Sequence, residues 1–456
     1  MKNNILAAFT FLSDKINKGH HRSVKAKRNI FATFIFKGCS IAISLVLVPL
    51  TIHYVNPTQY GVWLTLSSII GWFGFFDIGF GHGLRNKLTE SIAKGQFKLS
   101  RIYISTTYAI LCLIIGTALL VFLVINPFIN WAGILNTTPG MAVELSLLAL
   151  IVFVFFCLQF VLQLITTVLT ANQQPGYTSL FFFLGNVFSL MVIFILTKTT
   201  SGNLVNLGIV LGLTPVLVLL TSSIWFYTRS YKKFAPSIKF VRFRLAGNIV
   251  SLGVKFFILQ IAGLVLYESS NIIIAQLFGP AQVTTYNIAF KYFSIIPMVF
   301  TIIMTPFWSA FTKAWIEKDI AWIKNAMKKL QMAWLVFGIG AIIMLCFSNF
   351  IYKLWVGKSI VVPLSLSAAI AAYVIINAWN TIFAQFLNGV GKIRLQLYSG
   401  IWGAILNIPL AIYLGRMFGI SGVIFSSVLL TGLNMSWVYI QYNKIINNKA
   451  SGIWAK

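Results

Sequence analysis

Acidic residues, and charged residues in general, are what this chain has least of. Only 7 of its 456 residues are Asp or Glu, and all charged residues together make up 9%. Soluble domains carry about 25% charged residues. With 58% hydrophobic residues and a mean hydropathy of +0.87, this deficit excludes a water-soluble protein and predicts a polytopic membrane protein.

Cysteine and histidine are also scarce, with four of each. The cysteines lie in apolar runs without a CxxC pair, so they are interpreted as small buried hydrophobes that form no disulfide: Cys39, Cys112, Cys157 and Cys346. The histidines show no metal-ligand spacing, and His53 and His82 are interpreted as solvated loop residues. The sequence therefore predicts neither a metal site nor a cofactor.

Motifs of soluble enzymes and of ATP-driven pumps do not occur. The chain has no HExxH, no GxSxG and no P-loop, and its only close acid pair, Glu317 and Asp319, lies in a basic loop. The net charge of +28 does not indicate nucleic-acid binding here, because the basic residues stand between apolar runs, where they orient helices. A non-enzymatic membrane protein is expected.

An all-α fold of about twelve transmembrane helices is predicted, since a span needs about 20 apolar residues. The spans are 31–53, 61–82, 102–125, 142–170, 178–197, 206–227, 250–278, 284–311, 329–351, 363–388, 397–415 and 422–441. The fourth, seventh and eighth are long, which predicts tilts or kinks.

Lys and Arg are distributed unevenly between the two sides. With the N-terminus inside, the inner segments carry 28 of them and the outer loops four, with three more inside spans. Both termini are therefore predicted to be cytoplasmic. The division that follows is a basic amphipathic segment at 1–30, a first six-helix bundle at 31–228, a basic linker at 229–249, a second bundle at 250–442 and a tail at 443–456.

A weak internal repeat links the two halves. The stretch from Asn56 to Arg101 recurs 223 residues later, from Gly279 to Lys324, each copy having a Pro turn, an apolar span and a basic loop. The register matches Pro57 with Pro280 and Thr89 with Thr312. Such repeats are frequent in secondary transporters.

Charges inside the predicted spans are costly to bury and are therefore candidate functional residues. Lys37 and Asp77 fall at similar depth on either side of the turn near Asn56, as do Glu268 and Lys291 across a later turn, which predicts two ion pairs of structural or functional role.

Lys255 has no acid at its depth. It either snorkels to the inner surface or lines a cavity for an anion, and Arg85 at the edge of a loop is similar. Polar residues at helical spacing either line a path or join helices by hydrogen bonds. They include Gln159, Gln163, Gln260, Asn271, Asn380 and Asn388.

Four stretches together resemble one known family: YGVWLTLSSIIGWFGFFDIGFGHGLRNKLTESIAKGQ, NIIIAQLFGPAQVTTYNIAFKYF, PFWSAFTKAWIEKDIAWI and LNGVGKIRLQLYSG. They resemble the polysaccharide-transporter (oligosaccharide flippase) family, the Wzx-like branch of the multidrug/oligosaccharidyl-lipid/polysaccharide exporter superfamily. The resemblance implies two six-helix bundles around a cationic cavity in the bacterial inner membrane. It also implies movement of undecaprenyl-pyrophosphate-linked oligosaccharide for O-antigen, capsule or exopolysaccharide assembly.

By residue type, the implied cavity cations are Lys37, Arg85, Lys255 and Lys291. Asp77 and Glu268 are the deep acids available to a coupling cation, H⁺ or Na⁺, and a downstream polysaccharide polymerase is a candidate partner. Three alternatives stay open: a drug/cation antiporter of the same superfamily, a lipid-II-type flippase, and a membrane glycosyltransferase or O-antigen polymerase. The lysine surplus disfavours the first, the count of twelve spans the second, and the short outer loops the third.

Overall fold

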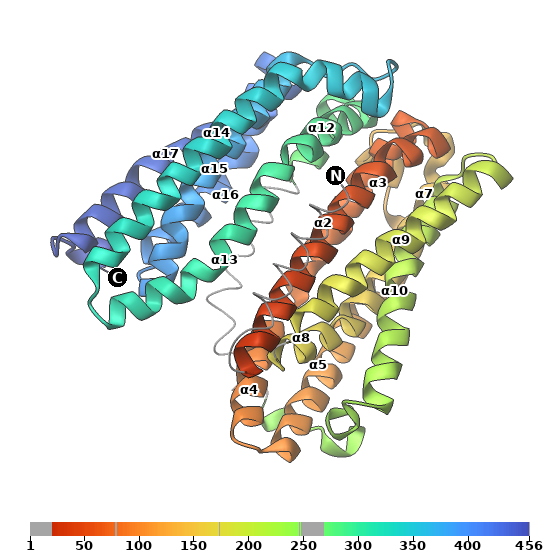
Figure 1. Ribbon diagram of the computed structural model, residues 1–456. Helices are drawn as coiled ribbons and strands as arrows, with labels where there is room; N and C mark the ends of the chain where they lie inside the picture. Colours follow the sequence, from red (N-terminus) through yellow and green to blue (C-terminus); the bar gives the residue numbers. More distant parts are fainter. Residues whose placement is uncertain (1–20, 78–79, 173, 246, 248–268, 456) are drawn as a thin grey trace, which may run out of the picture. The chain divides into compact units, whose positions relative to one another are not determined.

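The computed structural model describes residues 21–77, 80–172, 174–245, 247 and 269–455, and within this part the chain is all-helical, with 88% helix and no strands (Figure 1). Nine of the described helices are long and apolar enough to cross a membrane. The predicted all-α membrane fold is confirmed, while the number twelve and the orientation stay predictions.

Two compact units divide the chain. The first contains Met1–Leu50, Phe76–Ile129 and Ser146–Phe256, and the second contains Thr51–Phe75, Asn130–Leu145 and Phe257–Lys456. The helix α3 (Pro57–Gly71) therefore groups with helices of the second half. The predicted bundles at 31–228 and 250–442 are a different division of the chain and remain a prediction.

The first unit holds most of α2 (His21–Val55), the 3₁₀ turn η1 (Trp72–Asp77) in part, α4 (Phe80–Ala93) and α5 (Phe97–Ile125). Its later helices are α7 (Ala142–Leu162), α8 (Leu164–Ala171), α9 (Pro175–Thr199) and α10 (Leu204–Thr228). Three 3₁₀ turns follow α10: η4 (Lys232–Phe234), η5 (Ile238–Phe240) and η6 (Phe243–Leu245).

The second unit holds α3 together with α12 (Pro280–Phe293), α13 (Ile295–Ile316), α14 (Ile320–Val356), α15 (Leu364–Val390), α16 (Arg394–Phe418) and α17 (Ile420–Ile446). Helices α14 to α17 lie side by side in Figure 1, and α13, α14, α15 and α17 share an apolar core. Aromatic rings fill that core: Phe311 meets Phe386 edge-on at 5.6 Å, and Phe383 meets Tyr442 at 5.5 Å between centroids. Such pairs add stability beyond the buried area.

Two of the three long spans predicted to tilt or kink are broken in the structure, and most of the third, the seventh span at 250–278, lies outside the described residues. The fourth separates into α7 and α8 at Gln163, and the eighth into α12 and α13 at Ser294. The second break has a local cause. The ring of Pro297 meets the carbonyl position four residues earlier, at Phe293, and α12 ends there.

The internal repeat appears in the backbone where α3 and α12 begin. Asn56 before α3 has φ 108° and ψ 162°, and Gly279 before α12 has φ 87° and ψ 163°. A proline then opens each helix. The same conformation at the same register supports the 223-residue repeat more strongly than the few shared residues do.

The helices α3 and α12 also cross closely. A Cβ added to Gly61 would lie 1.7 Å from the Pro280 carbonyl oxygen, so only glycine fits there. Beside this contact, the Thr284 hydroxyl donates a hydrogen bond of 2.6 Å to the Pro57 carbonyl. The crossing thus uses one small residue and one hydroxyl, a usual means of packing membrane helices.

For three of the four cysteines, the predicted burial is wrong. Cys157 is buried, but Cys39, Cys112 and Cys346 are exposed on helix surfaces. In a membrane protein, an apolar run can face lipid as well as the protein interior, so the run alone does not indicate burial.

Candidate functional site

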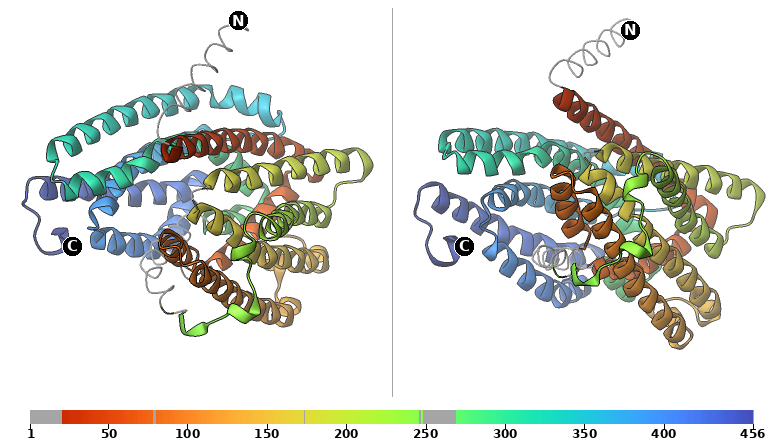
Figure 2. Two further views of the ribbon diagram at one scale, coloured as in Figure 1. Left: turned by 60° about the horizontal axis from the view of Figure 1, so that its bottom comes forward. Right: turned by 90° about the horizontal axis from the view of Figure 1, so that it is seen from below.

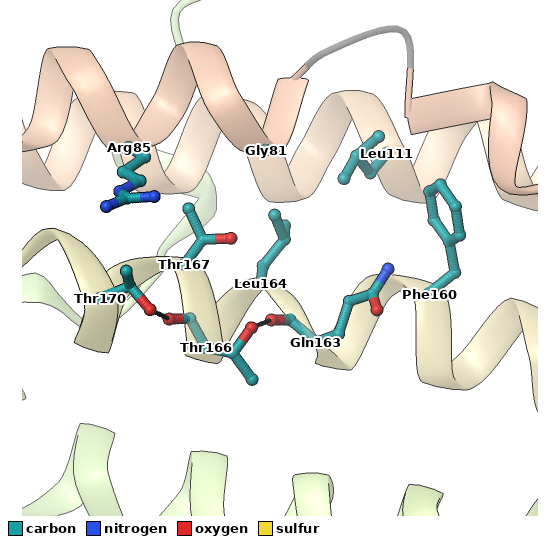
Figure 3. Close-up of a pocket in the computed structure, with 9 residues that line it drawn as sticks. All are labelled: Gly81, Arg85, Leu111, Phe160, Gln163, Leu164, Thr166, Thr167 and Thr170. Carbon is teal, nitrogen blue, oxygen red and sulfur yellow. Dashed lines mark hydrogen bonds between the residues drawn. The ribbon is translucent and has the colours of Figure 1, made fainter. Parts of the chain in front are cut away.

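The sequence-predicted residues Arg85 and Gln163 come together at a pocket of the first unit (Figure 3). Its cavity volume is about 240 Å³, and its other lining residues are Gly81, Leu111, Phe160, Leu164, Thr166, Thr167 and Thr170. Arg85 comes from α4, and the threonines come from α8. The pocket therefore combines a cation with a row of hydroxyl groups.

The break at Gln163 shapes one wall of this pocket. The Thr166 hydroxyl donates to the Gln163 carbonyl at 2.7 Å, and the Thr170 hydroxyl donates to the Thr166 carbonyl at 2.7 Å. Threonine hydroxyls that bond back onto the helix compete with the regular ladder and favour bends. These two hydroxyls have used their donors and can only accept further hydrogen bonds.

Three donors remain for a ligand among the described lining residues: the Arg85 guanidinium, the Gln163 amide and the Thr167 hydroxyl, none of which has a side-chain partner in the described structure. Arg85 and Thr167 face one another across the pocket in Figure 3. A fixed cation, an amide and a hydroxyl form a donor set suited to phosphate oxygens.

The charge of Arg85 is not neutralised by the described side chains. Glu90, the acid nearest in sequence on α4, pairs instead with Lys94 at 2.6 Å and Lys87 at 3.7 Å. Its hydrogen bond to Lys94 lowers the pKa of Glu90, so this carboxylate is already occupied. The acid on α4 is therefore engaged by two lysines, and Arg85 has no ion pair among the described residues.

The other predicted cations do not gather at this pocket. Lys37 is exposed on α2, and Lys291 is partly buried on α12 of the second unit. Lys255, Gln260 and Glu268 lie outside the described residues. Asp77 ends η1, and its side chain is not described, so both predicted ion pairs remain predictions.

The predicted polar residues of the second unit join helices. Asn271 donates to Ser68 on α3 at 2.7 Å and accepts from Asn287 on α12 at 2.7 Å. Asn380 donates to the Thr431 carbonyl at 2.9 Å, and its own side-chain oxygen is buried without a partner in the described structure. Gln159 and Asn388 are partly buried on α7 and α15.

Sequence reasoning missed Ser68 and Asn287, which complete the network around Asn271. Ser68 had no usable signal, since its partner lies 203 residues away. Thr167 belongs to the same polar stripe as Gln163, because it follows Gln163 by four residues, and the structure brings both to the pocket.

A family model described as "Polysaccharide biosynthesis protein" matches residues 26–311, which is more than half of the chain. The chain belongs to this family. A second model, MatE, matches residues 256–413. The match to the polysaccharide biosynthesis family extends over both copies of the internal repeat up to Phe311, and over every residue that lines the Arg85 pocket.

Curated relatives are similar over most of their length. The chain is 19% identical over 412 residues to a "Putative O-antigen export protein" of Yersinia pseudotuberculosis, which covers 87% of this chain and 91% of the relative. It is 21% identical over 438 residues to a "Putative O-antigen transporter" of Salmonella typhi, and this match covers 92% of this chain and 98% of the relative. With its apolar helices, this family member is a multi-pass bacterial membrane protein.

Solved structures with the same fold are MATE transporters. An "Inward-facing conformation of a multidrug resistance MATE family transporter of the MOP superfamily" aligns with a TM-score of 0.76, at 12% identity, over 90% of this chain and 96% of that one. At such identity the likeness shows the fold alone. This chain and that transporter thus share one fold.

Proposed function

We propose that this protein moves an oligosaccharide linked to undecaprenyl pyrophosphate across the bacterial inner membrane by alternating access. The observation that carries the proposal is the unpaired Arg85 guanidinium in a hydroxyl-lined pocket between membrane helices. The printed names of the two relatives, an O-antigen export protein and an O-antigen transporter, support the same class of cargo.

The pyrophosphate group is the part of the cargo that is most costly to move through the membrane. Its charge cannot cross hydrocarbon unpaired, because an isolated charge in a low-dielectric interior costs many kcal/mol. Arginine can bind phosphate oxygens with two parallel hydrogen bonds, and the Thr167 hydroxyl and Gln163 amide can complete the contact. The polyprenyl chain needs no polar partner and can stay in lipid.

Lys37, Lys255 and Lys291 are further cations for the same passage, and Asp77 and Glu268 are the acids for a coupling H⁺ or Na⁺. These roles follow from residue type and position in the sequence. In the same proposal, both termini and the 229–249 linker are cytoplasmic. Arg85 then lies at the inner end of its span, where a substrate made in the cytoplasm would enter.

A drug/cation antiporter has the same fold but needs a different site. A cationic substrate requires acids in its pocket, and none of the described residues that line the Arg85 pocket is acidic. An anionic cargo therefore fits the donor set better than a cationic one.

Transport in cells tests this proposal. In a strain that lacks its own flippase and carries this protein with its matching glycan genes, Arg85→Ala should reduce surface glycan at least ~10-fold, the size expected for losing a charge-assisted contact. Arg85→Lys should retain part of it, since it keeps charge without the bidentate geometry.

Lys94→Ala is the matched control. It removes a cation that pairs with Glu90 on the protein surface, an interaction of small energy, and surface glycan should stay normal. Protein level in the membrane is measured for every variant. Normal surface glycan in Arg85→Ala and Arg85→Glu would contradict the role of this residue.

A further inference from the structure

The segment that follows α10, residues 229–245, is a folded strap bound to the first unit. Three hydrogen bonds attach it to α5. Arg101 Nε donates to the Ala235 carbonyl at 2.8 Å, while the backbone N–H groups of Ser237 and Arg242 donate to the Ser105 and Thr106 hydroxyls at 3.0 and 2.9 Å. The hydroxyls in the first turns of an otherwise apolar helix are thereby explained.

Buried aromatic residues attach the other end of the strap. Tyr231 and Phe234 are each 3% exposed. The Tyr231 hydroxyl accepts from Asn172 at 2.6 Å and donates to Gln174 at 2.7 Å, beside the turn that joins α8 to α9. Figure 2 shows the strap in bright green, running beside the brown beginning of α5. Its backbone is held, so its outer side chains have defined places.

The outer side of the strap carries both apolar and basic groups. Ile238 is 91% exposed and Phe243 is 55% exposed, although both are large hydrophobic residues. Residues 229–245 also carry six exposed cations: Arg229, Lys232, Lys233, Lys239, Arg242 and Arg244. Residues 229–245 contain no acid that could neutralise these charges. A water-facing linker has no reason to combine such exposed apolar groups with unbalanced charge.

The strap lies at the ends of two membrane helices. It starts where α10 ends, at Thr228, and its contacts to α5 lie within the first three turns, from Arg101 to Thr106. The helical stretch Phe97–Phe128 has 32 residues. At 1.5 Å per residue it is about 48 Å long, well beyond the roughly 30 Å of hydrocarbon. Its first turns therefore reach the level of the lipid headgroups, and the strap lies with them.

We infer that this strap is a binding surface for anionic phospholipid headgroups. Ile238 and Phe243 enter the interface between headgroups and acyl chains, and the surrounding lysines and arginines pair with lipid phosphates. Charge complementarity selects an anionic lipid over a neutral one, and the exposed apolar pair selects a bilayer over a soluble polyanion. The inference goes beyond transport of the cargo and does not depend on it.

The inference is tested with the full-length protein in micelles. Phosphatidylglycerol is the probe, phosphatidylcholine is the neutral comparison, and native mass spectrometry counts the bound lipids. The test variant is Lys239→Gln with Arg244→Gln, because both side chains are exposed and neither has a hydrogen bond or ion pair among the described residues. Its affinity for phosphatidylglycerol should fall about 25-fold, at roughly 5-fold for each basic residue near the surface.

The control variant is Lys353→Gln with Lys358→Gln, which changes the net charge equally at exposed positions of the second unit. It should bind phosphatidylglycerol within about 2-fold of the unchanged protein. Ile238→Ser should weaken binding of phosphatidylglycerol and phosphatidylcholine alike, since it removes apolar contact and no charge. If the strap variant binds phosphatidylglycerol as tightly as the unchanged protein, the inference is wrong and a protein partner is the remaining occupant of the strap. If the control variant loses as much affinity as the strap variant, the inference is also wrong, and the loss is a general effect of net charge.

Discussion

The two copies of the internal repeat share one scaffold and differ in the side chains that can meet a substrate. In each copy a threonine bonds back one turn and also reaches another helix. Thr89 donates to the Arg85 carbonyl and lies 3.4 Å from the Ala171 carbonyl. Thr312 donates to the Trp308 carbonyl and, at 2.9 Å, to the Gly389 carbonyl. Arg85 of the first copy therefore corresponds to Trp308 of the second.

This correspondence separates what the scaffold requires from what the substrate requires. The capping conformation, the proline and the threonine recur because they position helices. The residue one turn before the threonine is a cation in one copy and an aromatic residue in the other. Trp308 lines a cleft of its own with Thr312, Lys313, Ile316 and Glu317. The repeat has kept its packing while its two sites acquired different chemistry.

The largest effect is expected at Gly61, where the copies differ in size. The first has Gly61 and the second has Thr284 at the same register. Gly61→Ala places a methyl group 1.7 Å from a backbone oxygen of α12, so the helices must move apart. We expect the variant to lose several kcal/mol and to give little folded protein in detergent, measured by size-exclusion chromatography and thermal unfolding.

Gly71→Ala is the control for this prediction. It lies in the same helix, and an added Cβ would meet nothing within 4 Å. It should fold normally and be slightly more stable, because alanine favours helix. Normal folding of Gly61→Ala would mean that the close crossing of α3 and α12 is not required.

An intermediate effect is expected where the helix caps are exchanged. Asn56 has a backbone conformation that is otherwise almost confined to glycine, whereas Gly279 has the same conformation without strain. Asn56→Gly should stabilise the protein by about 1 kcal/mol, because relief of strain exceeds the few tenths lost with the capping hydrogen bond.

The reverse exchange, Gly279→Asn, should destabilise the protein by about 1–2 kcal/mol. The midpoints of thermal unfolding of both variants measure this comparison. If Asn56→Gly and Gly279→Asn shift the midpoint of thermal unfolding equally and in the same direction, the two caps are not equivalent.

The smallest effect is expected at the paired threonines. Thr312→Val removes a hydrogen bond of 2.9 Å to α15, whereas Thr89→Val removes a contact of only 3.4 Å. We expect a loss of about 1 kcal/mol for the first and a few tenths for the second. Thermal unfolding of the two variants side by side measures the difference, and a larger loss for Thr89→Val would reverse the ranking.

The sequence predicts the all-helical membrane class and the repeat, because hydropathy and register are local properties. It also indicates Arg85 and Gln163, since a charge and an amide near a span end are visible in one dimension. Their meeting at one pocket could not be predicted, because it depends on the break at Gln163 and the packing of α4 on α8. The folded strap was also beyond prediction, since its anchors on α5 lie 132 to 136 residues away.

Binding of a polyprenyl pyrophosphate to the purified protein tests the central claim most directly. The unchanged protein and Arg85→Gln are placed in lipid nanodiscs, and their affinities for undecaprenyl pyrophosphate and for uncharged undecaprenol are compared. We predict that Arg85→Gln weakens binding of the pyrophosphate at least ~10-fold and leaves binding of undecaprenol unchanged. Equal affinity of both proteins for the pyrophosphate would contradict it.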